Sequence, residues 1–571
     1  MKHFQGRSIL IYWILVLAFY LALIGLHNDF HLSGFNGAYL RKIVDSMFLA
    51  LPVLFCKRKY LIFSYLFIAD LYLLSIIWYF RTYSAIMPLS SYLMIDNLDG
   101  LAPSIWHSIH LSDLKLVVPL LAFSFFYLKI YNKISSIEQY AWKNRWMMLF
   151  CVLLIVSFVS APYLPNKRPY FKQPFYLYKT ESVAGFKKYG VIHYWIYQCV
   201  SYCRVSDDNK KRARDFMARL SRASTSEKAL VSNGNKNLIL ILVESFQSWT
   251  IGLTVGEIEV TPNINSLLEQ ENVVYFPKEM PQVKDGRSSD AQLIINTGLL
   301  PLNTGAAASL YATNAFPSLA SALKERKYYS VSFICDKKSF WNQGATTIAY
   351  GFDKLYDQLQ GDEGREKADE NLFKKAIPIM QEIKSPFYAQ LVTLSSHEPY
   401  LKPIMNNSRL LGESFKDDEV KNYLVAIQYV DKCIAEFIDG LKRAGLYDNS
   451  IIVITGDHEQ MTYNKLEGRQ QLEARDCFVP FIVINSPLKS KHTDKVIGQI
   501  DIYTSLLSII GCNDYFFKGL GENVFGDSIS NYVSFRTGTV AGNVDIPDSI
   551  KKYKDECWEV SDVLLKMNYF K

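Results

Sequence analysis

Residues 451–458 read Ile-Ile-Val-Ile-Thr-Gly-Asp-His, an apolar run that ends in a glycine, a carboxylate and an imidazole. A short apolar run bounded by breakers predicts a buried strand, and the glycine allows the chain to turn sharply after it. In open α/β sheets, ligands bind outside the carboxyl ends of such strands. Asp457 and His458 are therefore candidates for a metal site at a sheet edge, because zinc and manganese accept mixed oxygen and nitrogen ligands.

The same pattern recurs in the second half of the chain. Three further apolar runs end in a side chain that can bind a metal or transfer a proton: Leu238–Val243 before Glu244, Tyr329–Cys335 before Asp336, and Tyr388–Ser396 before His397. Together with a strand at 481–485 and helical patterns at 261–270 and 420–444, these runs predict a parallel sheet with crossover helices from residue 237 onward.

The front of the chain is far more apolar than the rest. At 571 residues the chain is too long for one ordinary domain, and its 49% apolar and 14% aromatic content exceeds the soluble average. Five segments are long and apolar enough to cross a bilayer: residues 8–27, 38–56, 60–80, 114–131 and 146–163. No small-residue cleavage pattern follows the first segment, so we do not expect a removable signal peptide.

Basic residues beside these segments predict their orientation, because Lys and Arg in short loops are retained on the cytoplasmic side. Lys2 and Arg7 place the N-terminus inside. Five crossings also place the basic loops at 57–59 and 129–145 inside, whereas Arg41 and Lys42 fall on the other side. Everything after about residue 165 is then expected outside the cytoplasm.

The net charge of +7 does not predict nucleic-acid binding, because no nucleic-acid-binding module is present and the inside loops hold much of the excess. The basic stretch 210–222 is interpreted either as a solvated helix face or as a helix that lies along anionic lipid head groups. Nine scattered cysteines, an odd number, do not predict a disulfide framework.

A candidate nucleophile lies in residues 284–291, Lys-Asp-Gly-Arg-Ser-Ser-Asp-Ala, ahead of a helical run at 292–296. A hydroxyl at a helix N-terminus lies among free N–H groups that bind anions, and a metal lowers its pKa enough for attack. The alternative is that Ser288 and Ser289 only cap the helix. His397, ahead of a proline, is a candidate proton donor or a structural histidine. Only three histidines follow residue 235, which favours one metal over two.

Taken together, these residues resemble the membrane-anchored branch of the sulfatase and alkaline phosphatase superfamily, within it the lipoteichoic acid synthase and phosphoglycerol transferase group. The similarity extends over about residues 235–545 and is carried by segments 261–264, 430–458 and 500–507. It implies a multi-pass α-helical membrane domain followed by an α/β sulfatase-like extracytoplasmic domain. The expected divisions are a five-helix transmembrane domain at 1–165, juxtamembrane linker helices at 166–235, the catalytic domain at 236–545 and a tail at 546–571.

The resemblance also implies roles for individual residues. One divalent ion, manganese or zinc, would be held by Glu244, Ser288, Asp457 and His458. Ser288 would be the nucleophile, with Ser289 as the alternative if the register differs by one. His397 would act on the head group or the leaving group. The implied substrate-binding residues are Arg287, Asp336, Trp341, Asn342 and Gln343. Gln343 stands where the phosphoglycerol enzymes have an arginine.

The implied reaction moves a phosphoryl-linked head group, phosphoglycerol or a similar group, from a membrane phospholipid through a covalent Ser288 intermediate to an envelope glycan or glycolipid. The expected location is the bacterial cytoplasmic membrane, with the catalytic domain on the extracytoplasmic side. Three alternatives remain open. A phosphoethanolamine transferase would differ only in the head group, a sulfatase or phosphatase-type hydrolase would share the fold, and a silent binder of envelope glycopolymers would need no nucleophile.

Overall fold

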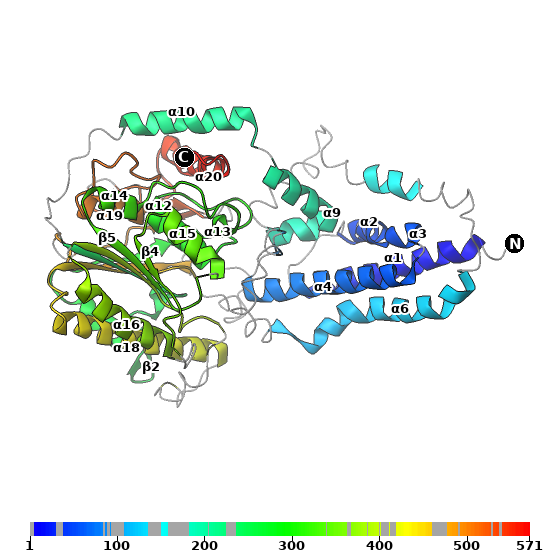
Figure 1. Ribbon diagram of the computed structural model, residues 1–571, viewed down its shortest axis with the longest axis horizontal. Helices are drawn as coiled ribbons and strands as arrows, with labels where there is room; N and C mark the ends of the chain where they lie inside the picture. Colours follow the sequence, from blue (N-terminus) through cyan, green and yellow to red (C-terminus); the bar gives the residue numbers. More distant parts are fainter. Residues whose placement is uncertain are drawn as a thin grey trace. The chain divides into compact units, whose positions relative to one another are not determined.

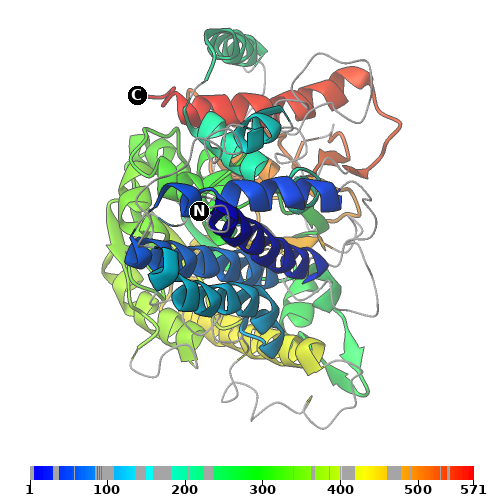
Figure 2. The same ribbon diagram turned by 90° about the vertical axis from the view of Figure 1, so that its right-hand side faces the viewer.

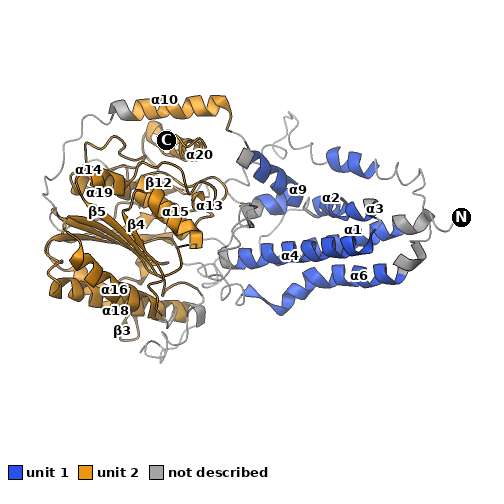
Figure 3. Cartoon of the chain, in the orientation of Figure 1, with its two compact units in different colours: residues 1–89, 102–204 blue, residues 90–101, 205–571 orange. Residues whose placement is uncertain are grey.

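The computed structural model describes two compact units, residues 1–89 with 102–204 and residues 205–571 with 90–101 (Figure 3). The described residues are 5–571 except 30–37, 57, 84–85, 88, 90–91, 93–107, 135–149, 158–181, 204, 224–235, 339, 362–366, 385, 399, 401–409, 411–417, 460–476, 489–490, 527–528 and 536–539. The second unit therefore begins 31 residues earlier than the expected start of the catalytic domain, because the helix after residue 206 packs with it.

The first unit consists of helices. Their bounds are α1 (Gln5–Asp29), α2 (Ala38–Ala50), α3 (Pro52–Phe55), α4 (Lys59–Tyr83), η3 (Leu111–Asp113), α6 (Leu114–Ile134) and α9 (Ser182–Cys203). α1 packs against α2 and α6, and α2 packs against α9. The core of this unit is made of aliphatic and aromatic side chains from these helices.

Three helices among the described residues are long and apolar enough to cross a membrane, over Leu10–Asp29, Lys59–Arg81 and Leu111–Lys129. They match the first, third and fourth expected segments. The second, 38–56, is divided because Pro52 lacks a backbone N–H and begins α3 as a new helix. With 13 residues, α2 extends about 20 Å, less than the roughly 30 Å of a hydrocarbon core. The fifth expected segment lies partly outside the described residues.

The second unit is an α/β domain around one large sheet. The sheet has the strand order β10-β4-β9-β8-β1-β7-β5-β6, with β11 paired to β4. The strands are β1 (Asn237–Val243), β4 (Val274–Met280), β5 (Tyr329–Ile334), β6 (Lys354–Tyr356), β7 (Phe387–Val392), β8 (Ser450–Gly456), β9 (Val479–Ile484), β10 (Lys491–His492) and β11 (Ile497–Gly498). This arrangement confirms the predicted α/β fold class.

Helices cover both faces of the sheet in Figure 1. One layer contains α12 (Ser288–Thr297), α14 (Leu319–Glu325) and α19 (Ile500–Ile509), and the other contains α16 (Ala368–Glu382) and α18 (Asp418–Arg443). Smaller elements are β2 (Thr254–Val255), β3 (Ile258–Glu259), α11 (Pro262–Leu268), α13 (Ala307–Leu310), η8 (Phe340–Asn342), α15 (Gln343–Ala349), β12 (Tyr532–Ser534) and β13 (Val540–Gly542).

The central strand β1 shows why this sheet forms. All seven of its residues are buried, and successive side chains point to opposite faces. Leu238, Leu240 and Leu242 pack in the core on one face, and Ile239 and Ile241 pack in the core on the other. Since burying one such side chain contributes roughly 1.5–3 kcal/mol, a continuous apolar run is stable only between two helical layers.

Two details of the sheet differ from the sequence prediction. The run 481–485 belongs to β9, which runs antiparallel to both β8 and β4, so the sheet is mixed rather than fully parallel. The run 388–396 is too long, because β7 ends at Val392 and the following residues turn. Buried apolar residues alone do not define strand direction or the point at which a strand becomes a turn.

The basic stretch at 210–222 lies on α10 (Asp207–Ala223), which crosses over α20 (Asp548–Lys566) and contacts it, as Figures 1 and 2 show. Ala213, Phe216 and Met217 are buried, and the ring of Phe216 stacks on that of Tyr553 at 5.6 Å. The apolar face of α10 is therefore covered by protein, while its basic face is exposed. The expected C-terminal tail also includes α20, whose side chains join the core. The eight cysteines whose side chains the structure describes are free.

Candidate metal centre and nucleophile

The ends of two neighbouring parallel strands bring the candidate metal ligands together. β1 and β8 are paired so that Val243 lies opposite Gly456, and Glu244 and Asp457 are the next residues of each strand. The Asp457 N–H donates to the Val243 carbonyl at 3.1 Å, which extends the pairing by one step. A Cβ at position 456 would lie 2.2 Å from the Phe246 carbonyl oxygen, so only glycine allows the two chains this close.

Glu244, Asp457 and His458 form a buried group whose ligand atoms all lie within 4.8 Å of one another. Nε2 of His458 lies 3.6 Å from Oε1 of Glu244 and 3.4 Å from Oδ2 of Asp457. Nδ1 of His458 lies 2.9 Å from the Glu459 carbonyl oxygen, and a proton there leaves the lone pair of Nε2 directed at the carboxylates. Three protein ligands from a mixed set of this kind suit a divalent ion with an open position.

Backbone groups hold the carboxylates in place. Oδ1 of Asp457 accepts from the N–H groups of Ser245 and His458, both at 2.7 Å. Oδ2 of Asp457 is buried and accepts no hydrogen bond from the residues that the structure describes. A buried carboxylate oxygen without a donor is costly unless a cation is present, so this atom fits a metal ligand.

The electrostatics of the group also favour a bound cation. Burial, followed by the neighbouring Glu244 carboxylate, raises the pKa of Asp457 to about 7. Burial also raises the pKa of Glu244 and lowers the pKa of His458 to about 4, so the imidazole is neutral at pH 7. A divalent cation would stabilise both carboxylates in their charged form.

Ser288 is the first residue of α12 and lies against this group. Its Oγ donates to Oε2 of Glu244 at 3.2 Å and lies 3.1 Å from Nε2 of His458. Ser289 points elsewhere, because its Oγ is buried and donates to the Gly286 carbonyl at 2.7 Å. Ser288 is thus the hydroxyl that lies among the proposed ligands, at the positive end of the α12 dipole. The N–H groups of Ser289 and Asp290 donate to the Gly286 and Arg287 carbonyls, each at 2.9 Å.

The preceding loop is fixed by two buried acidic residues. Oδ2 of Asp290 accepts from the N–H groups of Lys284 and Gly286, each at 2.9 Å. Arg287 adopts a positive φ of 47°, and its guanidinium contacts Oε1 of Glu459 at 2.9 Å and Nδ1 of His458 at 3.2 Å. The Arg287 side chain therefore contacts His458 from the side opposite the carboxylates.

The Arg287–Glu459 ion pair was not predicted from the sequence. Arg287 was expected to bind substrate, yet it is only 5% exposed and is paired with Glu459. A charged residue directly after Asp457-His458 was the available signal, since a buried acidic side chain requires a basic partner.

His397 follows a turn that is tied to the metal group. Oγ of Ser396 donates to the Glu244 carbonyl at 2.6 Å, and Oδ1 of the buried Asp369 accepts from the Leu394 and Ser395 N–H groups. Nδ1 of the partly exposed His397 bonds to the Glu398 carbonyl. The structure gives no contact between His397 and Ser288 among the described residues.

The other expected substrate-binding residues lie on η8 and α15 and at the end of β5. Asp336 follows β5 at the same carboxyl edge of the sheet as Glu244. Trp341 and Asn342 both adopt positive φ, at 49° and 50°, which is costly for such residues. η8 packs against α13, which packs against α12, so this segment is joined to the nucleophile helix through one intermediate element. Gln343 is buried, and its Oε1 has no hydrogen-bond partner.

Part of the second unit is similar to proteins of known families. Residues 236–512 match the family model described as Sulfatase. Lipoteichoic acid synthase 1 of Bacillus subtilis is 29% identical over 432 residues, which cover 71% of this chain and 66% of that protein. Lipoteichoic acid synthase 2 of the same organism is 30% identical over 319 residues, which cover 53% of this chain and 49% of that protein. The chain therefore spans less than two thirds of the length of each of these relatives.

A solved structure shows the same fold. The crystal structure of a lipoteichoic acid synthase from Listeria monocytogenes has a TM-score of 0.50 and 25% sequence identity, and the match covers 61% of this chain and 98% of that one.

Proposed function

We propose, because residues 236–512 are a sulfatase-family domain of the alkaline phosphatase superfamily, that this chain is a metal-dependent phosphotransferase. It moves a phosphoryl-linked head group, phosphoglycerol or a similar group, from a membrane phospholipid to an envelope glycan or glycolipid. The observation that carries this proposal is Ser288 Oγ, which lies 3.2 Å from Glu244 and 3.1 Å from His458 within the group that suits a divalent ion.

The reaction would proceed through two displacements at phosphorus. A divalent ion, manganese or zinc, bound by Glu244, Asp457 and His458 would act as a Lewis acid that lowers the pKa of the Ser288 hydroxyl. The Ser288 proton passes first toward Oε2 of Glu244, to which the hydroxyl donates. Ser288 Oγ then forms a bond to the donor phosphorus while the bond from phosphorus to the diacylglycerol oxygen breaks.

The remaining steps release the lipid and transfer the head group. The diacylglycerol oxygen takes up a proton, for which His397 is the proposed donor. An acceptor hydroxyl then attacks the phosphorus and gives its proton to His397, which lost one in the first step, while Ser288 Oγ leaves and regains its proton from Glu244. The positive end of the α12 dipole would stabilise the phosphoryl oxygens in both steps.

We further propose that the chain is an integral protein of the bacterial cytoplasmic membrane with its catalytic domain on the extracytoplasmic side. Three membrane-length helices among the described residues support the membrane assignment. The chain would cross the membrane three times, or five times if the two other expected segments also cross. An odd number of crossings puts the catalytic domain on the side of the membrane opposite an inside N-terminus. This location gives the domain access to the lipid head groups of the outer leaflet.

A phosphoethanolamine transferase is the second candidate. The phosphoglycerol enzymes have an arginine where this chain has Gln343, and Gln343 is a buried neutral amide with an unpartnered Oε1. A neutral group at this position would not repel a cationic head group, whereas an arginine would. The other cation near the site, Arg287, is paired with Glu459.

The test is incubation of the purified full-length protein, loaded with Mn²⁺ or Zn²⁺, with labelled phosphatidylglycerol or phosphatidylethanolamine. We expect release of diacylglycerol and a mass increase on the peptide that contains Ser288. The size of the added mass identifies the head group.

Ser288→Ala and Ser289→Ala form a matched pair for this test. Ser288→Ala is expected to abolish both diacylglycerol release and the adduct, while Ser289→Ala retains them because its hydroxyl bonds the Gly286 carbonyl. Full transfer by Ser288→Ala would contradict the nucleophile assignment. Absence of diacylglycerol and adduct with either lipid in the unmodified protein would favour the silent binder.

A further inference from the structure

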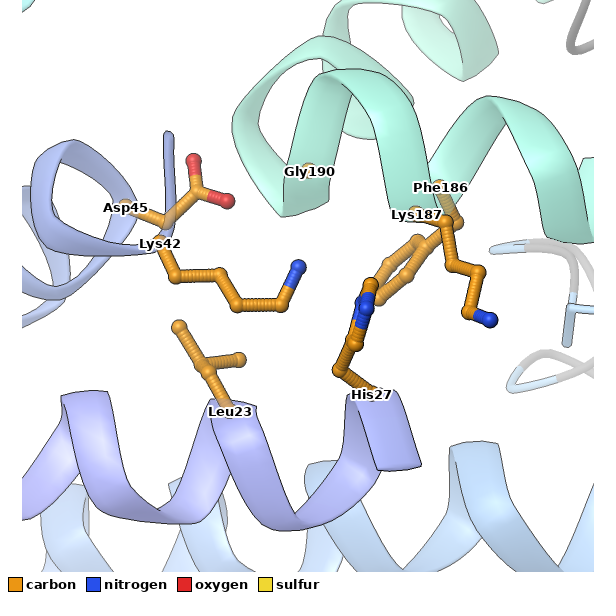
Figure 4. A pocket seen from close by; sticks show the side chains of 7 residues that line it. All are labelled: Leu23, His27, Lys42, Asp45, Phe186, Lys187 and Gly190. Atoms are coloured by element: carbon orange, nitrogen blue, oxygen red, sulfur yellow. The ribbon is translucent and has the colours of Figure 1, made fainter. Parts of the chain in front are cut away.

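The first unit contains a small pocket that the proposed reaction does not use. It lies among α1, α2 and α9, as Figure 4 shows, and measures about 230 Å³ with its open mouth included. Its lining residues are Leu23, His27, Lys42, Asp45, Phe186, Lys187 and Gly190.

Lys42 is the notable residue of this pocket. It is 5% exposed, and Figure 4 shows its side chain extending across the pocket toward the ring of His27. Within the part of the chain that the structure describes, no hydrogen bond or ion pair satisfies its ammonium group. Nδ1 of His27 is also buried without a hydrogen-bond partner. A buried ammonium without a partner is costly, so these two groups together point to an anionic ligand.

The one carboxylate of the pocket is already engaged by the backbone. Gly190 has a φ of 82° and interrupts α9, so the Val191 N–H has no partner within the helix. Oδ2 of Asp45 accepts from the Val191 N–H at 2.9 Å, and a Cβ at position 190 would lie 1.9 Å from this oxygen. Asp45 therefore stabilises a helix N-terminus. Against its one negative charge, Lys42 and Lys187 supply two positive charges.

The pocket lies near a polar boundary of the helical unit. Asp29, two residues after His27, pairs with Lys115 near the start of α6 and lies 3.6 Å from Arg81 near the end of α4. Arg81 also pairs with Asp113 at 2.6 Å. At about 1.5 Å per residue, His27 lies only about 3 Å along the axis of α1 from this charged layer. Such a charge layer at the ends of apolar helices marks the level of lipid head groups.

We propose that this pocket binds the phosphate group of an anionic phospholipid, with Lys42 as the principal donor and Lys187 and His27 as its neighbours. An ammonium group is a common phosphate ligand, and the phosphate would supply the partner that Lys42 lacks. The enclosed part of the pocket is small, about 10 Å³ for the centres of water-sized atoms, so it has no room for acyl chains. The acyl chains would remain in the bilayer beside α1 and α2.

This inference does not depend on the transferase activity, and its test is designed to remain valid if that activity fails. Full-length protein carrying Ser288→Ala, purified in neutral detergent with EDTA present, is titrated with phosphatidylglycerol, phosphatidylcholine or inorganic phosphate, and binding is followed by native mass spectrometry. Ser288→Ala prevents turnover, and EDTA removes the metal contribution of the catalytic domain to phosphate binding.

Two lysines provide the matched comparison. Lys42→Gln is expected to weaken phosphatidylglycerol binding by about tenfold or more, because it removes a charge-assisted hydrogen bond. Lys188 follows Lys187 in the chain but does not line the pocket. Lys188→Gln removes the same charge there and is expected to leave binding unchanged. Lys42→Arg is expected to restore most of the binding, which separates lost charge from lost folding.

The outcomes distinguish the sources of phosphate. Preference for phosphatidylglycerol over both other probes, lost in Lys42→Gln alone, supports the proposal. Inorganic phosphate binding as tightly as phosphatidylglycerol would overturn the lipid assignment in favour of a soluble anion. Equal weakening of binding by Lys42→Gln and Lys188→Gln, or no weakening by either, would overturn the proposal that the phosphate group binds in this pocket.

Discussion

Oγ of Ser288 and Nε2 of His458 lie 3.1 Å apart although 170 residues separate them in the chain. They meet because α12 begins at the same sheet edge at which β8 ends. His458 also lies 3.4 Å from Oδ2 of Asp457, the buried oxygen that accepts no hydrogen bond. One cation within reach of all three side chains would satisfy that oxygen, so the stability of this domain is expected to depend on metal.

We predict that Mn²⁺ or Zn²⁺ stabilises the protein and that Asp457→Asn abolishes this effect. Binding to the folded state alone contributes about 2.7 kcal/mol at a hundredfold excess over Kd. Without metal, Asp457→Asn is expected to be as stable as the unmodified protein or more stable, because it removes the repulsion between the Asp457 and Glu244 carboxylates. Thermal unfolding with each metal and with EDTA measures both effects.

The contrast between these two conditions makes the prediction specific. Asn at position 457 retains an oxygen that can accept from the Ser245 and His458 N–H groups, so folding is preserved. A variant that is destabilised equally with metal and with EDTA would show that Asp457 has only a structural role.

The ion pair of Arg287 and Glu459 leads to a second prediction. Both side chains are at least 94% buried, so Glu459→Gln leaves a guanidinium without its counter-ion and is expected to cost about 3–5 kcal/mol of folding free energy. The double variant Arg287→Met with Glu459→Leu is expected to recover most of this loss. Chemical denaturation of Arg287→Met, Glu459→Leu and the double variant gives the coupling between the two residues.

An exposed ion pair serves as the control. Asp439→Asn breaks the pair with Lys442, whose atoms lie 3.3 Å apart at the surface, and is expected to cost no more than about 1 kcal/mol. The double variant should still bind metal more weakly, because it removes the guanidinium beside Nδ1 of His458. Metal binding at the unmodified affinity would limit Arg287 to a role in folding.

The sequence predicts those parts of the site that depend on residues close together in the chain better than those that depend on contacts between distant segments. Glu244, Asp457 and His458 are predictable because each directly follows an apolar run, and parallel strands end at the same edge. The antiparallel direction of β9 is not predictable in this way, because its fully buried run VPFIVI shows no alternation that could define its neighbours. Its direction is determined by pairing with β8 and β4.

Residues in the surroundings of the site are less predictable still. Asp369 lies on α16 and supports the turn before His397 by accepting from the Leu394 N–H, 25 residues away in the chain. Nothing local in the sequence around Asp369 indicates this contact. Likewise Lys42 falls on the side of the membrane where basic residues are not expected. The pocket that surrounds it forms only when α2 packs on α9, which the sequence alone does not indicate.

A third prediction concerns pH. Burial raises the pKa of Asp369 from 3.8 to about 6, so the folded state binds this proton more tightly than the unfolded state does. The contribution of Asp369 to stability is therefore fully present below about pH 4, falls as pH rises toward about 6, and is constant above that. Asp369→Asn, whose oxygen can still accept from Leu394 and Ser395, is expected to flatten stability over this interval.

The measurement is the unfolding midpoint of both proteins in EDTA across that pH interval. Glu269→Gln, which alters an exposed carboxylate next to α11, is the control and should leave the slope unchanged. An unchanged slope in Asp369→Asn would mean that this carboxyl group does not titrate in the folded protein over that interval.

The final prediction concerns the head group. If η8 and α15 bind substrate, Gln343→Arg supplies the cation that the phosphoglycerol enzymes have at this position, and the ratio of diacylglycerol released from phosphatidylglycerol to that released from phosphatidylethanolamine is expected to rise. An added cation favours an anionic lipid and repels an ethanolamine group, an effect of several-fold for a partly desolvated contact. Ile348→Arg adds the same charge to the same helix at a residue that is 77% exposed, and should leave the ratio unchanged. Equal changes in both variants would indicate a general effect of charge on α15, and no change in either would place the selection of the head group elsewhere in the site.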